Sequence, residues 1–73
     1  MSYIKITFPD GRDVGLVEQS RIYGDLVEEG LEGLGRMDHG GFMNISYKGK
    51  LTPGVETRLD SLEEKGFKVE YKE

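Results

Sequence analysis

The sequence predicts an α+β fold in which a small curved sheet packs on one main helix. Three observations support this prediction: an alternating apolar pattern near the N-terminus, a stretch of helical periodicity after it, and a second alternating pattern near the C-terminus. We expect a mixed sheet of four to five strands. A chain of 73 residues is expected to form a single domain over residues 1–73, with a thin core.

The main helix is predicted at about residues 21–34. Ser20 is expected to cap its N-terminus through the side-chain hydroxyl, and Gly35 is expected to end it. Apolar residues recur at spacings of three and four, which places them on one side of a helix: Ile22, Tyr23, Leu26, Val27, Leu31 and Leu34. Carboxylates are expected on the opposite side: Asp25, Glu28, Glu29 and Glu32.

The first strand is predicted at residues 3–8, because apolar and polar side chains alternate there with a period of two. Pro9 and the Asp-Gly pair after it predict a turn at residues 9–12, and a return strand is expected at residues 13–18. In that return strand, Val14 and Leu16 would face the core.

The C-terminal half is predicted to contain two further main strands. The first spans residues 42–47 and a very short strand is expected near Leu51. Val55, Leu59 and Leu62 are at helical spacing, so a short helix or helical turn is predicted at about residues 55–64, ended by Gly66. The last strand covers residues 67–71, and the crossover rule favours a parallel pairing of the first and last strands at the sheet centre.

The stretches KITFPDGRDVGLVE and MNISYKGKLTPGVETRLDSLEEKGFKVEY, on either side of the helix, resemble the ubiquitin family laid end to end. Within the second, ISYKGKL is similar to that family's strand-turn segment, an apolar-x-aromatic-x-Gly-Lys pattern. The resemblance implies a ubiquitin-like β-grasp fold. Conjugated members and sulfur carriers end in Gly-Gly, whereas this chain ends VEYKE. A modifier or sulfur-carrier role would therefore require an extended or processed C-terminus.

Composition excludes several classes of protein. The chain contains no cysteine, so disulfides, a thiolate nucleophile and a cysteine-ligated metal are excluded. The N-terminal segment MSYIKITF alternates from its start and offers no long apolar run, so we expect no membrane span and a cytoplasmic location. A formal net charge of -4 disfavours nucleic acid as a partner.

No catalytic site is predicted. His39, the only histidine, has Asp38 beside it, but no second histidine supports a metal site or a general base. We therefore interpret His39 as a solvated loop side chain. No base is placed beside any serine, and we predict a protein that is not an enzyme and needs no cofactor or metal.

The most informative surface feature is a predicted segregation of charge. If the strands face as assigned, the open side of the sheet is rich in lysine. The leading hypothesis is a non-catalytic protein-binding module that offers this polar face, or an edge strand, to a protein partner. The residues expected to carry binding are Lys5, Ser46, Lys48, Lys68 and Glu70.

Two other interpretations of the charges remain open. Lysines on an exposed sheet also keep it soluble and discourage edge pairing between molecules. The alternative function is a small acidic inhibitor or decoy, of the kind made by phages, directed at a nucleic-acid-handling enzyme. The carboxylates of the main helix would carry that function: Asp25, Glu28, Glu29 and Glu32.

Overall fold

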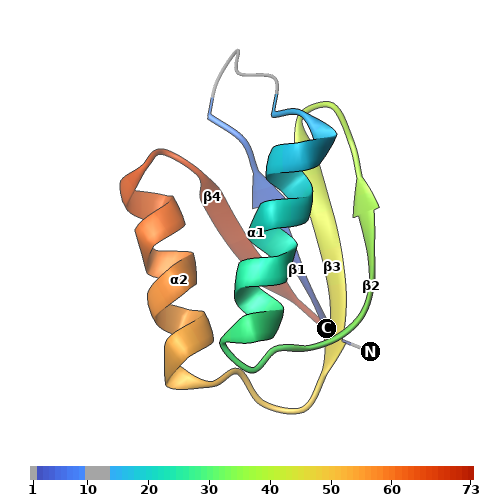
Figure 1. Ribbon diagram of the computed structural model, residues 1–73, viewed down its shortest axis with the longest axis vertical. Coiled ribbons are helices and arrows are strands. Elements are labelled where there is room, and N and C mark those ends of the chain that lie inside the picture. The colour runs from blue at the N-terminus through green and yellow to red at the C-terminus, as the bar shows by residue number, and fades with distance from the viewer. Residues whose placement is uncertain (1, 10–13) are drawn as a thin grey trace.

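Four strands and two helices follow one another in the order β-α-β-β-α-β in the computed structural model, which describes residues 2–9 and 14–73. The elements are β1 (Ser2–Thr7), α1 (Leu16–Glu28), β2 (Glu32–Asp38), β3 (Phe42–Lys48), α2 (Pro53–Glu64) and β4 (Lys68–Lys72). Both helices lie on the same side of the sheet, and the other side is open (Figure 1). The α+β prediction is therefore confirmed, with a second full helix.

The strands form one sheet in the order β2-β3-β1-β4, and every neighbouring pair is antiparallel. Each helix connects two strands that have one other strand between them, which is the split β-α-β arrangement. The strand that follows α2, β4, runs parallel to β3. Because β3 runs antiparallel to β1, β4 also runs antiparallel to β1.

This topology corrects two predictions about the sheet. The first and last strands are neighbours as expected, but they are antiparallel rather than parallel, so the described sheet is not mixed. The predicted return strand is also wrong, because residues 16–18 form the first turn of α1. The turn predicted at residues 9–12 lies mostly outside the described residues. A strand-to-helix connection thus stands where the β-grasp prediction had a hairpin followed by a helix.

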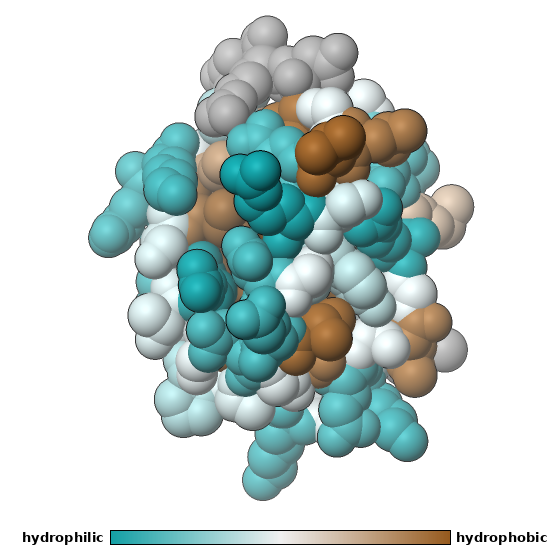
Figure 2. All heavy atoms as spheres, viewed as in Figure 1, coloured by the Kyte–Doolittle hydropathy of each residue, from teal (hydrophilic) through white to brown (hydrophobic). Residues whose placement is uncertain are grey.

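Helix α1 begins and ends earlier than predicted. Gly15, rather than Ser20, is its N-cap, and its buried residues are Gln19, Ile22 and Leu26, at spacings of three and four. Leu16 and Val17 are exposed on the first turn, and Figure 2 shows apolar atoms gathered there. Val14 is buried as expected, but Leu16 is 67% exposed, so the predicted alternation does not continue past residue 14.

The end of α1 is determined by Gly30, which has a φ of 110°. The Gly30 N–H donates to the Val27 carbonyl, and the Leu31 N–H donates to the Leu26 carbonyl, each at 3.0 Å. This pair of bonds is the Schellman motif, which requires a left-handed residue and so favours glycine. Gly35, the predicted helix end, lies in β2 instead.

Helix α2 confirms the prediction of a helix at residues 55–64, and Gly66 follows its end as predicted. The Thr52 hydroxyl accepts a hydrogen bond from the Val55 N–H at 3.1 Å and donates one to the Glu29 carbonyl at 2.7 Å. One side chain therefore caps α2 and also satisfies a free carbonyl at the end of α1. The short strand expected near Leu51 does not form, since Leu51 lies between β3 and α2.

The core lies between the helices and the covered side of the sheet. It contains aliphatic side chains of β1, β3 and both helices, together with Phe8 and Phe67, whose rings meet edge to face at 6.0 Å. Val27 and Leu34, which we expected in the core, are 42% and 54% exposed. The buried hydrophobic residues are Ile4, Ile6, Phe8, Val14, Ile22, Leu26, Leu31, Met43, Ile45, Tyr47, Val55, Leu59, Phe67 and Val69.

Candidate protein-binding face

The open side of the sheet brings three of the five predicted binding residues together. Ile4 and Ile6 of β1 point into the core, so Lys5 between them points to the open side. Lys5 pairs with Asn44 on β3 and with Glu70 on β4. Ser46 lies two residues beyond Asn44 on the same strand, and therefore on the same side.

The other two predicted residues lie at the ends of this face. Lys68 is opposite Thr7 at one end of the β1-β4 pair. Lys48 is opposite Glu32 at the far end of the β2-β3 pair. Both lysines are exposed. Lys68 and Lys48 therefore extend the charged face beyond its centre.

The sequence did not identify two further residues of this face. Gly35 is opposite Ser46, and Met37 is opposite Asn44, so both positions of β2 belong to the open side. Met37 is 64% exposed. Their alternation with Arg36 and Asp38 was the available signal, but Gly35 was predicted to end the main helix and no strand was predicted at residue 37.

Phe42 is partly shielded at one end of the face. The Lys5 ammonium lies 4.6 Å from the centre of the Phe42 ring, and the His39 imidazole stacks on that ring with 4.2 Å between centroids. His39 is thus half-buried against an aromatic ring rather than freely solvated. Among the described residues, no three histidine or carboxylate side chains gather closely enough to hold a metal ion.

The open face carries more positive than negative charge, although the chain has a net charge of -4. Its lysines are Lys5, Lys48, Lys68 and Lys72, and its carboxylates are Glu32 and Glu70. The Lys72 ammonium lies 3.6 Å from the Glu70 carboxylate. An exposed pair of this kind contributes little to stability.

The two helices on the other side carry more negative than positive charge. Figure 2 shows hydrophilic side chains spread over this side, with apolar patches between them. The pKa of the Tyr71 phenol, on the β4 edge, is raised above the ordinary value of 10.0. Partial burial is the largest cause, followed by the nearby α2 carboxylates of Glu63, Asp60 and Glu56. The α2 carboxylates thus form an acidic stripe behind the basic face.

The raised pKa of Tyr71 makes stability depend on alkaline pH. Its phenol is neutral below the pKa, so this contribution to stability is complete below about pH 10. It is lost as pH rises through the folded-state pKa. We expect Tyr71→Phe to make the fall in urea midpoint between pH 9.5 and 12 shallower than in the wild type. Tyr3→Phe, which removes a hydroxyl from the open face, is the control, and an equal change in both variants would contradict this explanation.

The carboxylates proposed for a decoy function do not share one surface. Asp25 and Glu28 belong to α1, whereas Glu32 belongs to β2, opposite Lys48. Glu29 is the C-cap residue of α1, and its carboxylate pairs with Arg58 at 3.3 Å. The prediction that all four line the back of one helix is therefore wrong.

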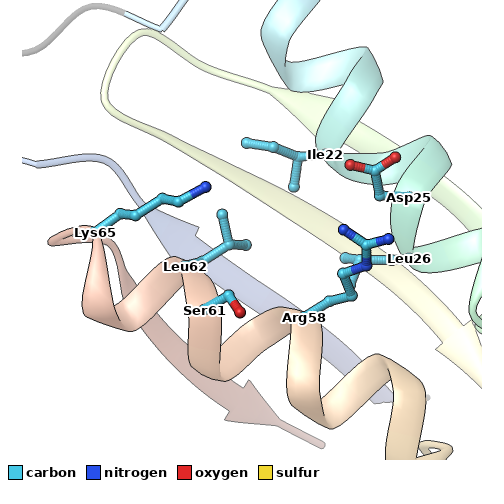
Figure 3. Close-up of a pocket in the computed structure, with 7 residues that line it drawn as sticks. All are labelled: Ile22, Asp25, Leu26, Arg58, Ser61, Leu62 and Lys65. Atoms are coloured by element: carbon cyan, nitrogen blue, oxygen red, sulfur yellow. The ribbon is translucent and has the colours of Figure 1, made fainter.

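A groove lies between α1 and α2 (Figure 3). Ile22, Leu26 and Leu62 form its apolar floor, while Asp25 and Arg58 stand at its rim. Its volume is about 70 Å³, well below the roughly 300–1,000 Å³ of ordinary ligand sites.

No protein-family model, curated protein or solved structure matches the chain. Within residues 2–9 and 14–73, none of the helices combines the length and the apolar character needed to cross a bilayer.

Proposed function

We propose that this chain is a non-catalytic protein-binding module whose open sheet face docks an acidic segment of a partner protein. The supporting observation is the register that gathers four lysines on the open side of a chain with net negative charge. Complementary charge across an interface accelerates encounter and selects partners. The proposal does not depend on the ubiquitin resemblance, because it uses only the open face of a sheet in which β1 and β4 are antiparallel.

Solubility alone explains the lysine pattern less well. Lysines that prevent edge-to-edge pairing belong on edge strands. Lys68 and Lys72 on the β4 edge fit that role, but Lys5 is on β1, which has a neighbour on each side. A lysine on a central strand does not protect an edge, and this favours a docking role for the face.

The face is also favoured over the two edge strands. On β4, Lys68, Glu70 and Lys72 present alternating charges along the edge. The pairing of β2 with β3 is irregular between Gly33 and Gly35. Charged side chains and bulges are the features by which natural edges resist an added strand.

An acidic protein segment fits this face better than single-stranded nucleic acid. Proteins that bind single strands stack bases on exposed aromatic rings. The Phe42 ring already contacts His39 and Lys5. Tyr3 is the other outward aromatic side chain of β1 and β3 on the described face, and one ring makes a poor stacking platform.

Affinity capture with matched charge variants tests the proposal. The face variant is Lys5→Glu with Lys68→Glu, and the control is Arg21→Glu with Lys65→Glu, which makes the same charge change on the helical side. We expect wild type and control to retain a common partner that the face variant loses. In a ¹⁵N NMR titration with that partner, amide shifts should fall on β1, β3 and β4. Retention by the face variant, or shifts confined to α1 and α2, would refute the proposal.

A further inference from the structure

A hollow lies on the open face between β1 and β2. Its lining residues are Tyr3, Gly35, Arg36, Met37, Asn44 and Ser46. The row Gly35-Ser46-Tyr3 crosses three strands, and its first two members have no side chain or a short one. A Cβ added at Gly35 would meet no atom within 4 Å. The hollow therefore exists because larger side chains flank a glycine.

The walls of the hollow suit an apolar group. Met37 is largely exposed on one side, and the Tyr3 ring stands on the other. Methionine is flexible and polarizable, which lets it adapt to partners of different shape. The volume is about 310 Å³, at the lower end of the range for ligand sites, roughly 300–1,000 Å³. That space fits one side chain of a docked segment.

Positive charge predominates around the hollow, although Glu70 lies opposite Lys5 and its carboxylate is 3.6 Å from the Lys72 ammonium. Lys5 is opposite Asn44, and Lys72 is opposite Tyr3, so each lysine neighbours a lining residue. Lys48 follows Ser46 by two positions on β3. The Arg36 guanidinium is committed elsewhere, since it pairs with Asp38 at 3.3 Å and donates to the Ser20 hydroxyl at 2.6 Å on α1. The hollow thus combines apolar walls from Tyr3 and Met37 with a polar floor from Asn44 and Ser46, inside a charged rim.

We infer that the hollow over Gly35 seats one apolar side chain of an acidic protein segment, while the surrounding lysines hold carboxylates on either side of it. The inference rests on the proposed function and adds the chemistry of the partner. It assigns two roles to the face: the lysines provide attraction to any acidic chain, and the hollow selects segments that carry an aromatic or aliphatic residue.

Peptides of composition Asp-Glu-Asp-Glu-X-Glu-Asp-Glu-Asp, with X as Gly, Leu or Trp, provide the probe. Dissociation constants are measured by ¹⁵N NMR titration at low ionic strength. We expect the Leu and Trp peptides to bind roughly tenfold more tightly than the Gly peptide, which corresponds to about 1.4 kcal/mol. Shifts for these peptides should centre on Gly35, Ser46 and Met37.

Gly35→Leu fills the hollow and should remove the preference for the Leu and Trp peptides over the Gly peptide. The matched control is Gly40→Leu, at another glycine whose added Cβ meets nothing within 4 Å, in the β2-β3 turn. The control should retain the preference. If X has no effect on affinity, or if the preference survives in Gly35→Leu, the inference is wrong.

The same titrations distinguish this inference from the proposed function. Lys5→Glu with Lys72→Glu should weaken all three peptides, including the Gly peptide. If that variant loses affinity but X has no effect, the proposed function stands and the inference that the hollow seats an apolar side chain is wrong. Absence of binding by every peptide would overturn both. Tighter binding of a thymidine oligonucleotide of equal charge, or self-association through this face on sedimentation, would assign the hollow to another occupant and overturn the inference.

Discussion

Leu26→Ala is expected to lower the free energy of unfolding by about 2–5 kcal/mol, the usual range for truncating a buried leucine. Leu26 is 1% exposed, and its carbonyl accepts the Leu31 N–H that ends α1. A small single domain has only a few kcal/mol of net stability. We therefore expect most of the variant to be unfolded at 37 °C, as measured by circular dichroism and urea titration.

Val27→Ala is the control for this prediction. Val27 is the next residue of α1, and it is 42% exposed. Alanine also has a higher helix propensity than valine, so the change should fall within about 0.5 kcal/mol of wild type. The sequence pattern placed both side chains in the core. Equal losses for the two variants would contradict the orientation of α1 described above.

Gly33→Val is expected to destabilise the fold by about 1–3 kcal/mol, as overpacking does. A Cβ at Gly33 would overlap the Tyr23 hydroxyl and would lie 2.9 Å from the Tyr23 Cζ. The Tyr23 ring also lies 5.6 Å from the Arg36 guanidinium. The rigid ring must move to admit a side chain, and its contact with β2 would be disturbed. The urea midpoint measures the loss.

Gly35→Val separates crowding from strand propensity. Gly35 is two residues further along β2, and an added Cβ there meets nothing within 4 Å. Because valine favours strands over glycine, Gly35→Val should be neutral or stabilising. If Gly35→Val instead loses more stability than Gly33→Val, the two glycines cannot lie on the sides of the sheet described above. A neutral or stabilising effect of Gly35→Val would also show that filling the hollow leaves the fold intact.

Strands β1, β3 and β4 could be predicted because apolar residues alternate in each of them with a period of two. Their alternation also predicted which side of the sheet Lys5, Ser46 and Glu70 would share. Helix α2 was predicted from the spacing of Val55 and Leu59, both of which are buried. These elements carry their own local pattern, and the structure adds only the partner against which each one packs.

Strand β2 could not be predicted in the same way. Leu31 and Leu34 continue the helical spacing of α1, and glycines at positions 33 and 35 weaken any strand pattern. Gly30 and the pairing with β3 determine the outcome, and that pairing is a tertiary contact that no local pattern shows. The hollow was missed for the same reason, since three of its lining residues belong to β2.

Paramagnetic relaxation with charged probes tests the central claim, a basic and open sheet face, without any partner. Amide protons are compared in the presence of equal concentrations of an anionic and a cationic nitroxide at low ionic strength. The anionic probe should relax the outward residues of β1, β3 and β4 more strongly, and the cationic probe should relax α2 more strongly. Equal relaxation by the two probes at Lys5, Ser46 and Glu70, or a cationic excess there, would contradict a docking face for acidic partners.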